Sequence, residues 1–409
     1  MISMIIADLH IHGRYSQGTS KELSISKLSQ WAKVKGVDLL GTGDFTHPQW
    51  FEEIRSELKE DGTGILKSQE GQNFMLQTEI SLIYSQGGMG RRIHVVLLAP
   101  DMSTAVNITD YFKSRGRVDY DGRPIFKIPC PELVRDMRSI SSDIEVIPAH
   151  IWTPWFSMFG SKSGFDTVQE CFGDQAEHIH AIETGLSSDP QMNWRLSQLD
   201  GIQILSFSDL HSFWPWRIGR EATVFDTEMR YDAILKAIRT GEGLHETIEV
   251  DPNYGKYHLD GHRKCDVCMH PIRTKQNNGM CPVCKKPLTI GVLNRIEDLA
   301  DRPEDYHDPK RPQFRTVIPL SELIALSLGK GITTKAVWSQ FDSLTNGTTE
   351  MDVLLYMAEA DIVDRSNQDM ARLILKNREG KIKVSPGYDG EYGKPQIGEK
   401  TKGLDEFMC

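Results

Sequence analysis

Near its start the sequence reads Met4-Ile5-Ile6-Ala7-Asp8-Leu9-His10-Ile11-His12, an apolar run that ends in a His-x-His pair and predicts a strand with metal ligands at its end. Side chains alternate between the two faces of a strand, so His10 and His12 point the same way and can bind one metal ion. A single histidine is more often a hydrogen-bonded core or loop residue than a metal ligand. The pair therefore predicts a metal site if other strands deliver further ligands to the same place.

Five later apolar runs carry imidazole or carboxylate groups at or near their ends. Together they supply Asp44, His47, Glu79, His94, His150, Asp209 and His211. Imidazole with carboxylate suits zinc, manganese or iron better than magnesium alone, which prefers oxygen ligands and retains its waters. Nine groups exceed the needs of one ion, so we expect two or three ions, with Glu79 as a bridging carboxylate. A bridging water would be acidic enough to be hydroxide near neutral pH, which is hydrolytic chemistry.

Four of these motifs resemble those of the polymerase-and-histidinol-phosphatase (PHP) superfamily of metal-dependent phosphoesterases. They are Asp8-Leu9-His10-Ile11-His12, Gly43-Asp44-Phe45-Thr46-His47, His150 and Ser208-Asp209-Leu210-His211. The resemblance implies an α/β fold, a distorted (β/α)7 barrel. It also implies one ion held by His10, His12, Glu79 and Asp209, a second by Glu79, His94 and His150, and a third by His211 with Asp44 or His47. Candidate catalytic residues are Asp209, Asp44 and Arg217.

Two positions depart from the superfamily pattern. Asp44-Phe45 stands where members have Asp-His, so the ligand role falls to Asp44 or to His47. Arg14, Tyr15 and Ser16 occupy the stretch where many members carry a further histidine. The third metal site is therefore the one that this sequence alters.

A second metal motif is Cys265-x2-Cys268, a spacer of twelve residues, and Cys281-x2-Cys284. Four thiolates in two knuckles predict a tetrahedral structural zinc site. Residues 256–286 hold seven Lys or Arg and two acids, in a chain whose net charge is -10. This basic element either only rigidifies a linker or contacts the phosphate backbone of DNA.

Over about residues 1–395, this combination resembles the endonuclease Q family of DNA-repair nucleases more narrowly. At 409 residues the chain is too long for one typical domain. We expect a barrel at 1–248, a four-cysteine zinc domain at 249–290, a helical DNA-binding domain at 291–380 and a turn-rich tail at 381–409. Gly329 and Gly331 interrupt the helical pattern, and they either contact a phosphate or simply end a helix.

Loops that follow metal ligands build the pocket of a barrel enzyme. Aromatic residues there can stack on an extruded base, and arginines can hold phosphate, although at least half of such aromatics pack in cores. The candidate substrate-binding residues are Arg14, Trp152, Trp155, Glu183, Ser187, Trp214, Arg217, Arg220, Gly329 and Gly331.

The resemblance implies a damaged-DNA endonuclease that nicks 5′ of uracil, hypoxanthine, xanthine or abasic sites, with Zn²⁺, Mn²⁺ or Mg²⁺ in the barrel. The alternatives are a small-molecule phosphomonoesterase and a non-catalytic DNA-binding module. Neither a signal pattern nor a stretch of ~20 apolar residues occurs, so we expect a cytosolic, nucleoid-associated protein. Leu404, Asp405 and Phe407 partly resemble a sliding-clamp peptide, which makes the replicative clamp a candidate partner.

Overall fold

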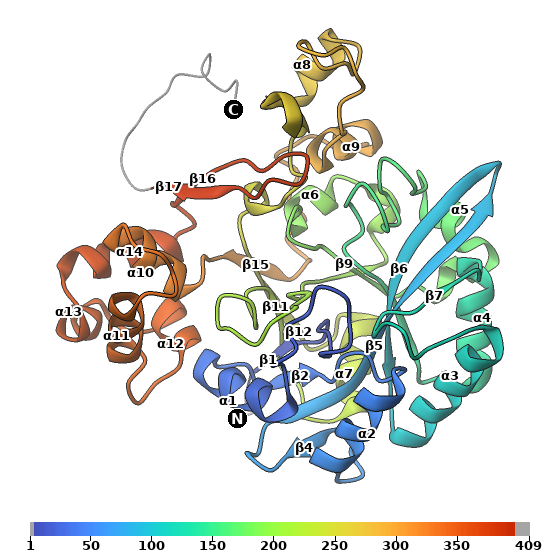
Figure 1. Cartoon of the computed structure of the whole chain (residues 1–409), viewed down its shortest axis with the longest axis horizontal. Helices are drawn as coiled ribbons and strands as arrows, with labels where there is room; N and C mark the ends of the chain where they lie inside the picture. The colour runs from blue at the N-terminus through green and yellow to red at the C-terminus, as the bar shows by residue number, and fades with distance from the viewer. Residues whose placement is uncertain (1–3, 397–409) are drawn as a thin grey trace.

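A computed structural model describes residues 4–396 (Figure 1), and the predicted mixed α/β architecture is confirmed. Eleven strands form one sheet that curves into a distorted barrel. Its strands are β1 (Ile5–Asp8), β2 (Leu39–Gly41), β3 (Leu58–Glu60), β4 (Leu66–Ser68), β5 (Asn73–Gln86), β6 (Met89–Ala99), β7 (Ile125–Phe126), β8 (Glu145–Pro148), β11 (Ala222–Phe225), β12 (Leu244–Glu249) and β15 (Gln313–Thr316). The parallel pair β9 (Ala181–Glu183) and β10 (Gln203–Leu205) lies beside β8.

Helices surround this barrel (Figure 1). They are α1 (Ile25–Lys35), α2 (Pro48–Glu57), α3 (Met102–Arg115), α4 (Cys130–Ile140), α5 (Val168–Phe172), α6 (Pro190–Trp194) and α7 (Tyr231–Thr240). Helix α1 begins at Ser24, whose hydroxyl accepts the Lys27 N–H, and ends at Gly36 in a left-handed conformation. Gly36 also permits a close approach, since a Cβ there would lie 2.6 Å from Thr349 Oγ1.

Strand β1 is central because it pairs with β11 on one side and with β2 on the other. Its buried Asp8 accepts the N–H groups of Ser208 at 3.0 Å and Gly219 at 2.9 Å, which ties the segment after β10 to β1. Beyond the strand, Ile11 forms a parallel bridge with Leu210. The two segments that carry histidines after β1 and after β10 therefore lie side by side.

The long β5–β6 hairpin projects from the barrel at the right of Figure 1. Its register pairs Glu79 with Val96 and Ser81 with His94. Glu79 and His94 are thus diagonal neighbours on one face of the hairpin. This register delivers a carboxylate and an imidazole to the same side of the sheet.

Beyond the barrel, a small element contains β13 (Asp260–His262), β14 (Val267–Met269), α8 (Pro271–Gln276) and α9 (Val292–Leu299). The helical region comprises α10 (Leu320–Leu328), α11 (Lys335–Leu344), α12 (Glu350–Leu355), α13 (Glu359–Arg365) and α14 (Gln368–Arg378). The chain then forms an antiparallel hairpin of β16 (Lys383–Ser385) and β17 (Lys394–Gln396). The division into four domains remains a proposal, and β15, within the proposed helical domain, pairs with β12 of the barrel.

The helical region packs against the barrel through aromatic rings and one buried ion pair. Trp338 on α11 lies 5.6 Å from Trp31 and 5.8 Å from Trp214, measured between ring centroids. Lys35 at the end of α1 contacts Glu350 on α12 at 2.7 Å, and both side chains are almost fully buried. These contacts fix the helical region on the barrel beside the segment that follows His211.

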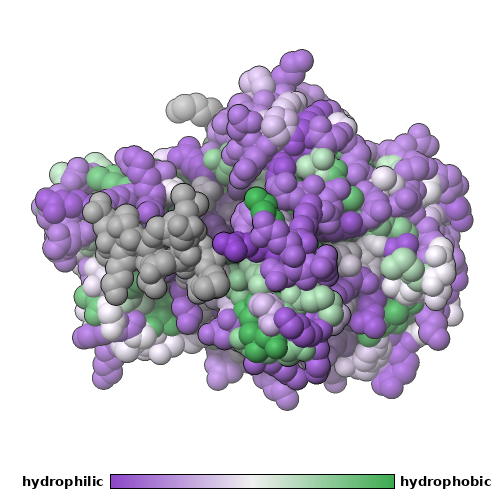
Figure 2. Space-filling view, turned by 90° about the horizontal axis from the view of Figure 1, so that it is seen from above, coloured by the Kyte–Doolittle hydropathy of each residue, from purple (hydrophilic) through white to green (hydrophobic). Residues whose placement is uncertain are grey.

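The surface seen from above is mostly hydrophilic, and its apolar residues lie in small, separate groups (Figure 2). No helix within residues 4–396 is long and apolar enough to cross a membrane. The expected cytosolic location stays a prediction. The candidate clamp peptide, with Leu404, Asp405 and Phe407, lies outside the described residues.

Candidate metal centre

Four of the predicted ligands meet at one end of the barrel, although one of them, Glu79, lies in the middle of β5 and not at a strand end. His10, His12, Glu79 and Asp209 each offer a ligand atom, and these atoms all lie within 4.8 Å of one another. His12 Nε2 is 3.0 Å from Asp209 Oδ1 and 3.2 Å from Glu79 Oε2. His10 Nε2 is fully buried and finds no hydrogen-bond partner among the described residues. Two imidazoles directed at two carboxylates, with one buried ring nitrogen left without a partner, fit a divalent ion.

Glu79 also belongs to a second group with His94 and His150. Its Oε1 is 2.7 Å from His94 Nδ1 and 3.4 Å from His150 Nε2. Burial lowers the pKa of His94 to about 4, so this imidazole is neutral at pH 7 and keeps a free lone pair. The two oxygens of Glu79 face different groups, which is the arrangement of a carboxylate that bridges two ions.

Two buried carboxylates lie behind the histidines and orient them. Both oxygens of Glu183 contact His10 Nδ1, at 3.0 and 2.9 Å, and Glu183 also accepts the His150 N–H at 2.8 Å. Asp44 contacts His12 Nδ1 at 3.1 Å and accepts the Gly13 N–H at 2.7 Å. Carboxylates in such positions fix the ring orientation of ligand histidines. Glu183 was expected to line the pocket, but its side chain is fully buried behind His10.

The predicted third group does not assemble within residues 4–396. Asp44 is engaged by His12 and Gly13, and His47 instead stacks on Tyr15 with ring centroids 4.5 Å apart. His211 lies beside His12, at 4.6 Å between ring centroids. The carboxylate that was expected to join His211 thus serves to position a ligand of the first group.

Arg123 is a residue of this centre that the sequence reasoning missed. Its guanidinium donates to Glu79 Oε2 at 3.0 Å. Although burial alone would lower the pKa of Arg123, Glu79 and then Asp209 raise it above its usual value, so its positive charge is permanent. Arg123 lies in a loop between α3 and α4, and no pattern in the sequence marks it. Its charge lies among the carboxylates where a third ion was expected.

A cavity of about 800 Å³ opens over the two groups. Its wall is formed by Gln17, Gly18, Arg92, His94, His150, Thr153, Trp155, Phe156, Gly185, Leu186, Ser187, Phe207, Asp209, His211, Arg217, Arg220, Lys256, Tyr257 and Tyr392. The candidates Trp155, Ser187, Arg217 and Arg220 thus lie in the wall. Tyr257 and Tyr392 were not expected there, because they come from segments after the barrel. Lys256 belongs to the basic element at 256–286, for which a phosphate contact was one of the two interpretations.

The other substrate-binding candidates lie away from the wall. Trp152 is 1% exposed and donates to Asn193 Oδ1 at 2.8 Å, so it packs in the core. Trp214 stacks on Trp216, with 5.2 Å between ring centroids, within the tryptophan contact to the helical region. Arg14 pairs with Glu53 at 2.7 Å. Aromatic rings bury large apolar areas, which explains why these tryptophans pack rather than face the cavity.

Gly329 and Gly331 are exposed in the turn between α10 and α11, outside the cavity wall. Gly329 ends α10 in a left-handed conformation, with φ of 61°. This is the helix-ending role that the sequence allowed. A phosphate contact by this turn remains a proposal.

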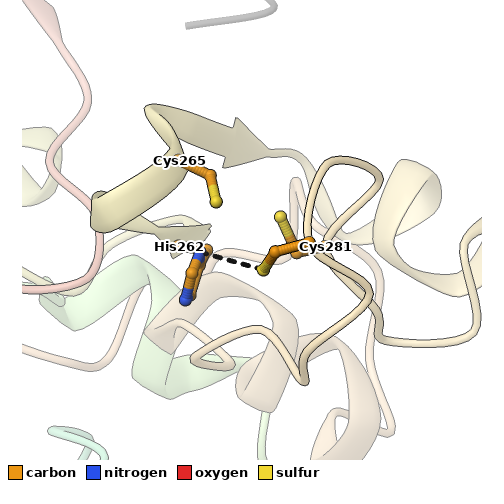
Figure 3. Close-up of side chains that lie close together, drawn as sticks. His262, Cys265 and Cys281 are labelled. Carbon is orange, nitrogen blue, oxygen red and sulfur yellow. Dashed lines mark hydrogen bonds between the residues drawn. The ribbon is translucent and has the colours of Figure 1, made fainter.

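A separate cysteine cluster lies in the small element (Figure 3). It comprises Cys265, Cys281, Cys284 and His262, with Cys284 Sγ 3.6 Å from His262 Nδ1. The sequence predicted Cys268 as the fourth member. Cys268 pairs with Gly261 across the β13–β14 hairpin, so its side chain and that of His262, one residue further along, point to opposite faces. Three sulfurs and one imidazole are also a zinc-type ligand set.

Comparison with known proteins gives consistent matches. The family model of the MJ0043 C-terminal domain matches residues 319–381. The MJ0043 protein of Methanocaldococcus jannaschii is 35% identical over 252 residues, which cover 59% of this chain and 31% of that protein. The chain thus spans about a third of the length of that relative.

Two solved structures match along nearly the whole chain. The lesion-specific endonuclease PfuEndoQ of Pyrococcus furiosus is 29% identical, with a TM-score of 0.86 and coverage of 99% of this chain and 98% of that one. Endonuclease Q in complex with a 27-mer duplex that has an abasic lesion at the active site is 30% identical, with a TM-score of 0.87 and coverage of 99% and 100%. The chain therefore belongs to the endonuclease Q family.

Proposed function

We propose that the protein is a metal-dependent endonuclease that nicks DNA on the 5′ side of deaminated bases and abasic sites. The observation that carries this proposal is Glu79, whose two carboxylate oxygens face two histidine groups at the base of the cavity. The relative with an abasic duplex at its active site supports DNA as the substrate.

The ligand set determines which ions would suit the centre. His10, His12, Glu79 and Asp209 would hold one ion, and Glu79 with His94 and His150 would hold the other. Mixed imidazole and carboxylate favour zinc, manganese or iron. Ions bound there supply an acidic water as nucleophile and stabilise the charge on the leaving oxygen.

The other residues of the centre orient the ligand histidines, neutralise negative charge on the phosphate and enclose the base. Glu183 and Asp44 hold the ligand histidines in place, as their hydrogen bonds indicate. Arg123 adds a fixed positive charge beside Glu79, where negative charge develops on a phosphate in the reaction. Trp155 and Phe156 give the cavity an apolar wall that can accept a base.

Selection of damaged nucleotides follows from the cost of extrusion. A metal centre recessed in a cavity cannot reach a backbone phosphate of a regular duplex unless the strand is bent or a nucleotide is extruded from the stack. Extrusion costs a few kcal/mol and is easiest where pairing is weak or the base is missing. A pocket that leaves an exocyclic amino group without a partner also rejects that base, because an unmatched buried polar group is costly.

A panel of end-labelled duplexes tests the proposal, each with one deoxyuridine, deoxyinosine, deoxyxanthosine or abasic site, with manganese, magnesium or zinc. We expect one nick immediately 5′ of the lesion, with 3′-hydroxyl and 5′-phosphate ends, and no cleavage of the undamaged duplex. Asp209→Asn should abolish nicking while far-UV circular dichroism stays unchanged. Rapid hydrolysis of small phosphomonoesters with every lesion duplex intact would refute the nuclease and favour a phosphatase.

A further inference from the structure

The wall of the cavity is positively charged in a chain that is acidic overall. It contains the cations Arg92, Arg217, Arg220 and Lys256, whereas Asp209 is its only carboxylate among the described residues. The whole chain has ten more acidic than basic side chains. The cavity is therefore a local site for an anion, and Asp209, with the histidines of the two metal groups, occupies only part of its wall.

Tyr392 contacts two of these cations, in the part of the wall that is formed by segments after the barrel. Its ring lies 4.7 Å from Lys256 Nζ and 5.8 Å from Arg217 Cζ, measured to the ring centroid. Both distances are within the ~6 Å range of a cation–π contact. Arg220 is close to Arg217 but donates to the Ser208 carbonyl, so its guanidinium is partly engaged. Neither Arg217 nor Lys256 forms a salt bridge within residues 4–396. The Glu322 carboxylate is near enough to Arg217 to favour its charged form, which keeps this guanidinium positive for an anion in the cavity.

The C-terminal hairpin holds Tyr392 in this position. Three N–H groups of the loop between β16 and β17 donate to carbonyls of one short segment: Gly387 to Asn253, Gly390 to Lys256 and Gly393 to Tyr254. The contact is so close that a Cβ on Gly387 or on Gly393 would collide with the backbone of that segment. Lys256 is thus tied to the same loop that carries Tyr392.

A second attachment joins this loop to the small cysteine-containing element. Asp389 accepts the Arg263 N–H at 2.7 Å and the Thr289 hydroxyl at 2.6 Å. The hairpin is therefore held between the small element and the segment 253–256, and this part of the chain reaches the cavity wall through Lys256, Tyr257 and Tyr392. The hairpin is a structural part of the candidate site rather than an appended tail.

We propose that Tyr392, Lys256 and Arg217 form a second phosphate subsite, which binds the phosphate on the 3′ side of the extruded nucleotide. Each nucleoside in a strand joins two phosphates. If the 5′ phosphate lies at the metal groups, as the proposed function requires, the 3′ phosphate emerges elsewhere in the same cavity. Tyr392 is a positioning residue that aligns the two cations. The inference rests on the proposed function and adds the hairpin to the recognition of the substrate.

Neutralising one phosphate tests this subsite directly. The substrate is a duplex with one abasic site, prepared with either a normal or a methylphosphonate linkage on its 3′ side. Affinity is measured by fluorescence anisotropy in an Asp209→Asn background, so that the DNA stays intact, and kcat/KM for nicking is measured with the active protein. Each is compared for wild type, Tyr392→Ala, Tyr392→Phe and Tyr356→Ala.

Tyr356 gives a matched control, because it is exposed and carries Arg315 5.7 Å from its ring centroid, but it is not in the cavity wall. We expect Tyr392→Ala to weaken binding of the normal duplex about 5- to 30-fold, with little change for Tyr392→Phe and Tyr356→Ala. The methylphosphonate should weaken DNA binding by the wild-type protein by a similar factor. It should weaken binding by Tyr392→Ala only a little further, because the two changes remove the same interaction.

Other results would overturn either the phosphate subsite or the proposed function. Fully additive losses, or wild-type binding that is indifferent to the methylphosphonate, would overturn the subsite while leaving the nuclease intact. A wild-type protein that nicks no lesion duplex would instead overturn the proposed function. Hydrolysis of bis(p-nitrophenyl) phosphate, which has no second phosphate, reports on the metal centre of each active variant, and far-UV circular dichroism shows that each variant has folded. A loss of this activity in Tyr392→Ala, with Tyr392→Phe unaffected, would show that the residue supports the metal centre, and would overturn the subsite.

Discussion

Glu183→Gln isolates the role of a carboxylate that touches no substrate in this account. Glu183 faces His10 Nδ1 with both oxygens and accepts the His150 N–H with one of them. A glutamine keeps the size but replaces one acceptor oxygen by an NH₂ group. The glutamine NH₂ group then faces the N–H of His10 or of His150, so two hydrogen-bond donors meet. A buried donor without an acceptor costs about 1–3 kcal/mol.

That cost should appear as weaker ion binding, because His10 and His150 belong to different groups of the centre. We expect metal affinity to fall about 10- to 100-fold. Competition with a fluorescent chelator measures the affinity, and excess metal should restore much of the nicking rate. Glu145→Gln is the matched control, since Glu145 is also buried and contacts His180 Nδ1 at 2.9 Å, but belongs to no metal group. Unchanged metal affinity in Glu183→Gln, or an equal loss in the control, would refute this reasoning.

Three further predictions concern stability and the cysteine cluster. Glu350→Ala should destabilise the fold by about 3–5 kcal/mol in urea unfolding, because it leaves the buried Lys35 ammonium unpaired, and Lys35→Met with Glu350→Leu should recover most of the loss. Burial raises the pKa of Glu249 from its usual 4.5 to about 8, so the folded state keeps a proton that the unfolded state releases. Stability should therefore fall between about pH 4.5 and 8, by at most about 5 kcal/mol, and Glu249→Gln should flatten this dependence in unfolding curves. Cys281→Ser or His262→Ala should remove one ion per chain in elemental analysis and weaken DNA binding, with a loss that shrinks at high salt.

The sequence predicted those features that depend on local periodicity. His10 and His12 share a face because side chains alternate along an extended segment. Later apolar runs marked Glu79, His94 and Asp209 as further ligands, but Glu79 and His94 lie in the middle of β5 and β6 and not at strand ends. The superfamily resemblance predicted the barrel, and the structure confirms that fold class. The two cysteine knuckles are likewise recognisable from spacing alone.

The remaining features depend on contacts between distant segments. Arg123 meets Glu79 across 44 positions, and Glu183 meets His10 across 173, so no spacing rule could connect them. Trp214 was expected in the pocket, but the helical region supplies Trp338 as a neighbour, and the rings pack together. His262 enters the cysteine cluster because the hairpin register turns it, rather than Cys268, to that face.

The most direct test of the central claim is to count bound ions in wild type and in Glu79→Gln by elemental analysis of metal-loaded protein. Wild-type protein should hold one ion for each of the three ligand groups. Glu79→Gln should keep the ion of the cysteine cluster, lose ions from the barrel and no longer nick an abasic duplex. Wild-type protein that nicks the duplex with only the ion of the cysteine cluster, or Glu79→Gln protein that keeps every ion and full activity, would contradict the account.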